Sequence, residues 1–181
     1  MKRALLPILL LSSGTLWAQD AATRNNFEIG GGGIFPVSGY KTYDYSSGPA
    51  GRLGYELRLI KPIGVEAGIT EAWLPGLSCE AYGCTYPTET SKFLDTGLRG
   101  HLLLARGRID LSAGLGGGYV WYQYGYMNQA LFQYSGKAAV ALDRSGRFRF
   151  AVTVRLWRDL GRPTEQWLST TGSLIFGLGR L

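Results

Sequence analysis

The amino-acid sequence predicts an all-β protein in which eight antiparallel strands close an up-and-down barrel. From residue 26 onward, apolar and polar residues alternate with a period of two, the spacing of strands with two different faces. Glycine accounts for 27 of 181 residues and aromatic residues for 13%, whereas charged residues account for only 18%. This composition excludes a disordered chain. Connections of short and long length follow one another in turn, as in a meander of hairpins.

The first residues have the layout of a secretory signal peptide. Lys2 and Arg3 precede a short apolar stretch, and Ala18 offers a small residue before Gln19. We expect cleavage of residues 1–18, a short tail over 19–25 and a barrel domain over 26–181. Loss of the two basic residues lowers the formal net charge from +6 to +4. With no basic cluster or nucleic-acid motif, the sequence predicts no nucleic-acid partner.

Each predicted strand has one face of mainly apolar residues. In chain order, the first four faces carry Phe27, Ile29 and Phe35; Leu53, Tyr55, Leu57 and Leu59; Ile63, Val65, Ala67 and Ile69; and Leu94, Leu98, Leu102 and Leu104. The last four carry Ile109, Leu111, Leu115, Tyr119 and Trp121; Phe132, Tyr134, Val140 and Leu142; Phe148, Phe150, Val152, Val154 and Leu156; and Leu174, Phe176 and Leu178.

The connections place all long loops at one end of the barrel. Short turns are expected at residues 60–62, 105–108 and 143–147, and longer loops at 37–48, 71–91, 123–130 and 158–166. Since the two lengths alternate along an up-and-down sheet, both chain termini lie at the short-turn end.

The polar face identifies the inside of the barrel. It holds five acids and six bases, which we expect to form a charge network in the lumen: Glu28, Arg52, Glu56, Arg58, Glu66, Asp95, Arg99, Asp110, Lys137, Arg149 and Arg155. Glycines between them leave room for long side chains to cross the axis, and a neighbour such as Gly68 is expected to tolerate serine. Buried charges must be paired, and the nearly equal counts permit this.

The apolar face has the composition of a surface in contact with lipid. Aromatic residues such as Trp73 and Trp121 gather near the long loops, others such as Phe27 and Phe176 near the short turns, and aliphatic residues lie between. Two aromatic girdles around an apolar band are typical of outer-membrane barrels. The sequence therefore predicts a transmembrane β-barrel with a polar lumen and an apolar exterior. A soluble lipocalin-like barrel is the alternative with the faces exchanged.

The chain resembles the small eight-stranded bacterial outer-membrane β-barrel proteins, the group that includes outer membrane proteins A and X. Segments such as Gly54–Leu59 and Gly64–Ile69 carry the resemblance, which covers residues 26–178. The resemblance implies a location in the bacterial outer membrane and contact with its lipid. It also implies the outer-membrane assembly machinery as a partner during biogenesis.

The sequence points to no catalytic, cofactor or metal site. The glycine runs lack a complete phosphate-binding pattern, and metal binding needs more ligands than two cysteines and one distant histidine. Some barrels of the resembled group modify lipid A with histidines near the outer leaflet, but His101 is expected at the opposite end, facing inward. Cys79 and Cys84 lie five residues apart in the longest loop and predict a disulfide; free thiols are the alternative.

The long loops are the remaining candidates for recognition of an extracellular ligand. They carry tyrosines, a residue type favoured in binding surfaces: Tyr40, Tyr43, Tyr45, Tyr82, Tyr86, Tyr124 and Tyr126. Packing among the loops is the alternative role. We expect a non-enzymatic protein of the outer membrane, with a role in envelope integrity or surface interaction and a lumen plugged by paired charges. The alternatives are a narrow porin-like channel and a soluble periplasmic carrier.

Overall fold

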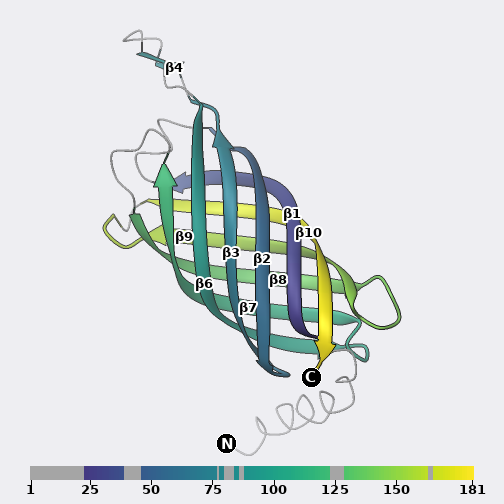
Figure 1. The fold of residues 1–181 in the computed structure, drawn as a ribbon. Coiled ribbons are helices and arrows are strands. Elements are labelled where there is room, and N and C mark those ends of the chain that lie inside the picture. Colours follow the sequence, from purple (N-terminus) through teal and green to yellow (C-terminus); the bar gives the residue numbers. More distant parts are fainter. Residues whose placement is uncertain are drawn as a thin grey trace, which may run out of the picture.

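Eight long strands form a closed antiparallel barrel in the computed structural model, which describes residues 23–38, 46–76, 78–79, 84–85, 88–122, 129–162 and 165–181 (Figure 1). The barrel strands are β1 (Thr23–Ser38), β2 (Gly48–Ile60), β3 (Ile63–Leu74), β6 (Glu89–Leu104), β7 (Ile109–Tyr122), β8 (Gln129–Ala141), β9 (Phe148–Asp159) and β10 (Gln166–Arg180). Each strand pairs with its neighbour in the chain, and β1 closes the barrel against β10. The predicted up-and-down barrel is confirmed.

The strands extend beyond their predicted limits. β1 begins at Thr23, where Thr23 pairs with Arg180, so the predicted tail over 19–25 is part of the barrel from residue 23. At the long-loop end, β3 continues to Leu74 and β6 starts at Glu89, which shortens the predicted loop over 71–91 from both sides.

A small two-stranded sheet lies within the longest loop. β4 (Ser78–Cys79) and β5 (Cys84–Thr85) pair antiparallel, with Ser78 opposite Thr85 and Cys79 opposite Cys84. Figure 1 shows β4 well beyond the barrel rim. The backbone therefore brings the two cysteine positions face to face, while their side chains lie outside the described part of the structure. The disulfide stays a prediction.

The outer surface of the barrel is apolar over its middle. Leu53, Leu98 and Leu115 are each more than half exposed, at 56%, 55% and 56%. Aromatic pairs flank this band: Tyr119 and Trp121 towards the loops with ring centroids 4.8 Å apart, and Phe148 and Phe176 towards the turns at 5.1 Å. A barrel in water would bury such residues, so this exterior suits a lipid surrounding.

The short connections gather at the end where the chain finishes (Figure 1). The turn between β6 and β7 is tight, since Ala105 and Arg106 adopt left-handed φ angles of 50° and 59° before Gly107 at 77°. Such angles are uncommon for residues other than glycine. No helix in the described ranges is long and apolar enough to cross a membrane.

A charge on the outward face should destabilise the barrel in lipid. Leu53→Arg places a guanidinium in the apolar band, where the cost reaches about 2–4 kcal/mol at the bilayer midplane. Leu53→Ile keeps the apolar surface and should cost less than about 1.5 kcal/mol. Urea titration of the two variants in lipid vesicles measures both values. Equal stability would mean that position 53 is in contact with water.

Candidate functional site: the charged lumen and its apolar cap

All eleven predicted lumen charges lie inside the barrel, and none of them exceeds 7% exposure. They come from every long strand except β10, and they form ion pairs across the axis as well as between neighbouring strands. Lys137 of β8, for example, places Nζ 2.5 Å from Oε2 of Glu28 on β1, three strands away around the barrel. These pairs tie the walls of the barrel together through its interior.

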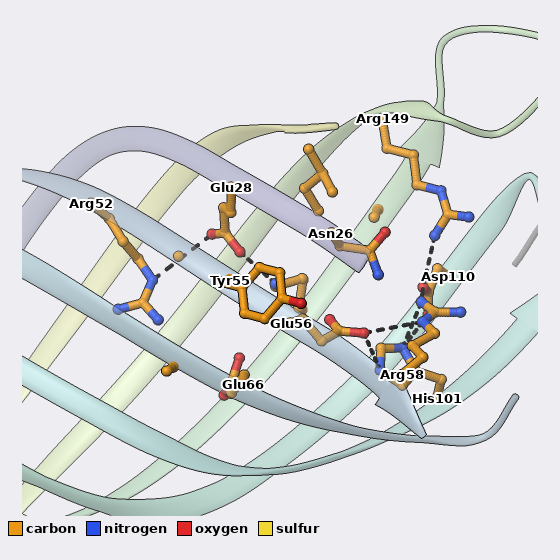
Figure 2. A pocket seen from close by; sticks show the side chains of 15 residues that line it. Asn26, Glu28, Arg52, Tyr55, Glu56, Arg58, Glu66, His101, Asp110 and Arg149 are labelled. Carbon is orange, nitrogen blue, oxygen red and sulfur yellow. Dashed lines mark hydrogen bonds and ion pairs between the residues drawn. The ribbon is translucent and has the colours of Figure 1, made fainter. Parts of the chain in front are cut away.

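The first part of this network lies near the short turns and centres on Asp110. Its carboxylate accepts hydrogen bonds from Arg58 and from Nη1 of Arg149 at 3.1 Å, and its Oδ1 lies 3.0 Å from Nδ1 of His101. Nε2 of His101 lies 3.0 Å from Glu56, which also accepts a 3.0 Å hydrogen bond from Nε of Arg58 (Figure 2). His101 is thus enclosed between two carboxylates, and every partner is itself part of the network.

The second part occupies the middle of the lumen. Arg52 donates two hydrogen bonds to Asp95, at 2.6 and 2.8 Å, and Arg99 donates two to Glu66, at 2.9 and 2.7 Å. Such two-point contacts fix the planes of both groups and are among the strongest side-chain hydrogen bonds. Figure 2 shows that Arg52 points towards Glu28 on the adjacent strand, and the two side chains form an ion pair.

Arg155 is the least satisfied member of the network. Its Nη2 lies 3.6 Å from Glu66 Oε2, and all three of its guanidinium nitrogens are buried without a hydrogen-bond partner. It is also the sixth base against five acids. Arg155 is therefore held in the lumen by an ion pair without a hydrogen bond.

Glycines in the lumen wall serve two purposes. At Gly68, an added Cβ would lie 2.3 Å from Nη2 of Arg52, so this glycine makes room for the guanidinium. A serine there would require the guanidinium of Arg52, which contacts Asp95, to shift, and the expected mildness of Gly68→Ser stays a prediction. At Gly116, a Cβ would lie 2.0 Å from the carbonyl oxygen of Thr96. There the glycine permits close approach of β6 and β7 instead of opening the lumen.

The lumen is filled by these side chains. The cavity enclosed between Glu28, Glu56, His101 and Asp110 leaves about 10 Å³ for the centre of a water-sized sphere, room for about one water molecule. Among the described residues, no group of three metal-ligating side chains is placed to hold an ion. The arrangement can hold charge in a fixed pattern, but it contains no open site for a substrate or cofactor.

An apolar cap closes the lumen at the long-loop end, and the sequence analysis did not predict it. Phe93 stacks on Trp157 with ring centroids 4.8 Å apart and meets Trp167 edge-on at 5.9 Å. The cap is a buried cluster of Ile34, Ala50, Ala72, Leu74, Phe93, Val120, Tyr122, Leu131, Trp157 and Trp167. These residues share the inward phase of the charges. Some of them, such as Ile34 and Val120, lie within the predicted strands, and others, such as Leu74, lie in segments that the sequence predicted as loops.

Buried acids border this cap. Glu89, Asp159 and Glu165 are each at most 2% exposed. Asp159 accepts hydrogen bonds from the backbone N–H groups of Gly161 and Arg162, at 2.7 and 3.1 Å. Arg162 also donates to Glu165 at 3.3 Å. These contacts fold the described part of the β9–β10 connection onto the mouth of the barrel.

The predicted recognition residues of the loops fall outside the described residues: Tyr40, Tyr43, Tyr45, Tyr82, Tyr86, Tyr124 and Tyr126. Their role stays a prediction. The structure describes the end of the barrel from which these loops extend. Trp73 and Trp121 are exposed on its outer surface, at 42% and 39%.

Removal of the central carboxylate of the turn-end network should destabilise the barrel. Asp110→Asn leaves Arg58, His101 and Arg149 buried with one acid fewer, and the loss of one partner of a buried pair costs about 3–5 kcal/mol. Glu71→Gln, an outward-facing change, should stay within about 0.5 kcal/mol. Urea unfolding in lipid vesicles, followed by tryptophan fluorescence, compares the two. A loss below about 1 kcal/mol for Asp110→Asn would contradict the role of the network.

No family model and no curated protein matches the sequence, but solved structures match the fold. Ail, the attachment invasion locus protein of Yersinia pestis, is 9% identical with a TM-score of 0.59, over 86% of this chain and 99% of that one. Neisserial surface protein A is 8% identical with a TM-score of 0.61, over 86% and 98%. OprG from Pseudomonas aeruginosa is 10% identical with a TM-score of 0.57, over 88% and 100%. The chain therefore has the fold of the small eight-stranded outer-membrane β-barrels.

Proposed function

We propose that this protein is an integral barrel of the bacterial outer membrane with a closed lumen, which acts through its external loops or through its contribution to the envelope. The observation that carries the proposal is the distribution of polarity. Charged side chains fill the inside, and leucine, isoleucine, valine and aromatic residues cover the outside. Lipid is therefore its first partner. Cleavage of residues 1–18 and the outer-membrane assembly machinery belong to the same proposal.

The soluble-carrier alternative requires the opposite interior. A lipocalin-like barrel offers an apolar cavity to its ligand, whereas here Arg52, Asp95 and Arg99 occupy the axis with 3% exposure or less. Burial of an apolar ligand beside these groups would separate charges that now pair. The interior therefore argues against a carrier.

The channel alternative meets two barriers in series. The ion-pair network leaves room for about one water molecule near the turns, and the cap of Phe93, Trp157 and Trp167 blocks the other end. Eight strands enclose a space that side chains can fill completely. Steady conduction would require both barriers to move, so the geometry favours a closed barrel.

The surface is then the place where a distinctive activity would lie. A solved structure of Ail holds the heparin analogue sucrose octasulfate; that chain is 11% identical with a TM-score of 0.53 over 85% of this protein. A barrel of this fold can thus bind a sulfated ligand. For this chain we propose the tyrosine-bearing loops as that surface, with the Cys79–Cys84 disulfide shaping the longest one.

Membrane fractionation tests the location. The mature protein should stay in the membrane pellet through carbonate and high-salt washes and should migrate differently on gels before and after heating, because a folded barrel resists denaturation by detergent at room temperature. A periplasmic soluble protein prepared in parallel should be released by the same washes. Release of this protein together with that control, without a heat-dependent shift, would refute the proposal.

Planar-bilayer recordings test the closed lumen. The native protein should give no steady conductance. Arg52→Ser with Asp95→Ser removes the ion pair in the middle of the lumen but leaves the cap. Trp157→Ala with Trp167→Ala removes part of the cap but leaves this ion pair. The barrel should remain largely closed in each of these two double variants. The four changes together leave the turn-end network around Asp110 as the remaining barrier, so they should give more openings than either pair alone. Large reproducible openings of the native monomer would contradict the two-barrier arrangement.

A further inference from the structure

A groove on the outer surface of the barrel is not explained by the closed lumen. Its floor is made of small outward-facing residues on three adjacent strands: Gly100 on β6, Ala113 on β7, and Gly136 and Ala138 on β8. Leu115 and Val154 rise on its two sides. Two overlapping shallow hollows, which share Ala113, Gly136 and Val154, form this β7–β8 groove.

The groove is open at Gly136, whereas aromatic rings lie over two other glycines of the outer face. A Cβ at Gly33 would lie 3.0 Å from the Phe35 ring, and one at Gly172 would lie 3.6 Å from the Phe150 ring. At Gly136 nothing lies within 4 Å. Aromatic side chains therefore smooth the lipid-facing surface at Gly33 and Gly172 but leave it hollow at Gly136.

The length of the groove along the barrel axis matches the thickness of one leaflet of a membrane. Its lining runs from Leu111 to Leu115 on β7, about 13 Å of strand at about 3.3 Å per residue. With a tilt of about 40°, this corresponds to about 10 Å along the barrel axis, close to half of an apolar band about 25 Å tall. The groove begins beside Pro62 in the turn between β2 and β3, so this leaflet is the one at the short-turn side.

Four arginines stand at the open end of the groove. Arg106 and Arg108 lie in the turn of the β6–β7 hairpin, and Arg144 and Arg147 lie in the turn of the β8–β9 hairpin. All four are exposed, and within the described residues none of them forms an ion pair. Asp143 is the only acid of these two turns, and it already accepts hydrogen bonds from Ser145 and from the N–H of Phe148.

We propose that the groove and these four arginines together bind one anionic phospholipid, an inference that rests on the membrane location proposed above. The phosphate is held by the arginines, which suit planar two-point recognition of phosphate oxygens. One acyl chain lies in the groove over Gly136 and Ala113. Hydrophobic contact and charge attraction thus act on two ends of the same molecule, as in other basic sites for anionic lipids.

A second copy of the chain is a poorer occupant. A symmetric pair brings the same patch of both copies together, which would place two sets of these arginines close to each other. The outer surfaces of two barrels are convex and would touch along a narrow line. Neither barrel would then fill the groove of the other. A lipid satisfies both the shape and the charge.

Native mass spectrometry of the folded mature chain in detergent tests the site. With dioleoyl phosphatidylglycerol and dioleoyl phosphatidylcholine supplied at equal concentration, the native chain should retain the anionic lipid preferentially. Arg106→Gln with Arg108→Gln should weaken that binding about fivefold per arginine removed. Gly136→Leu should weaken binding of both lipids by filling the groove. Gly136→Ala should weaken it to a smaller extent, and this variant serves as the test where the leucine variant folds poorly.

Matched variants separate the site from general effects. Gly117→Leu places the same side chain on the outer face of β7 beyond the groove, and Lys92→Gln removes a positive charge near the loops; both should bind lipid like the native chain. Heat-dependent gel migration confirms that each variant is folded. Inorganic phosphate at the lipid concentration should not displace the lipid, and displacement would identify a phosphate site and overturn the proposal.

Three further results would overturn it. These are equal retention of the two lipids by the native chain, unchanged affinity in the arginine pair, and a dimer that Gly136→Leu abolishes while lipid adducts persist. A protein released from membranes by carbonate would instead refute the proposed location. A membrane-inserted barrel without lipid preference would refute only this site.

Discussion

The pairing of charges in a lumen that side chains fill is the constraint on which the rest of this barrel depends. Eight strands leave an interior that side chains fill, and each charged group that points inward must find its partner there. Asp110 therefore collects Arg58, His101 and Arg149, and Arg52 reaches Asp95 from the opposite side of β3. Because partners come from different strands, correct pairing requires correct strand order and register. The lumen thus helps to specify the topology that encloses it.

The polarity of the outer face follows from the same arrangement. With its polar groups paired inside, the barrel has apolar side chains left for the outside, and closure of β1 on β10 satisfies the backbone groups that an open edge would expose. Lipid can then solvate the exterior without competing for any internal bond. Aromatic pairs at both ends mark the two borders of this apolar band.

The sequence predicted most of this fold because the alternation of apolar and polar residues has a period of two. This alternation can be recognised without knowing which strands contact one another. It identified all eight long strands and the eleven charged residues that face inward. It could not assign partners, since alternation places Arg99 on the inner face but does not say that Glu66 of β3 will hold it. It also missed the cap, because Phe93, Trp157 and Trp167 are apolar residues at inward positions, where the polar pattern predicted none. Nor could it show that the space beside Gly68 is occupied, because only the course of the Arg52 side chain reveals this.

The cap and the charge network depend on each other through solvent access. An ion pair is stronger where water is excluded, but its members also lose more hydration on burial. The stacked rings of Phe93 and Trp157 separate the ionic layer from the long-loop mouth, so the pairs below them lie in a less polar medium than an open pore would provide. In such a medium a broken pair is costly, and the side chains have strong reason to remain in the arrangement observed. Hydration of the charges from the long-loop end would therefore require the cap to move first.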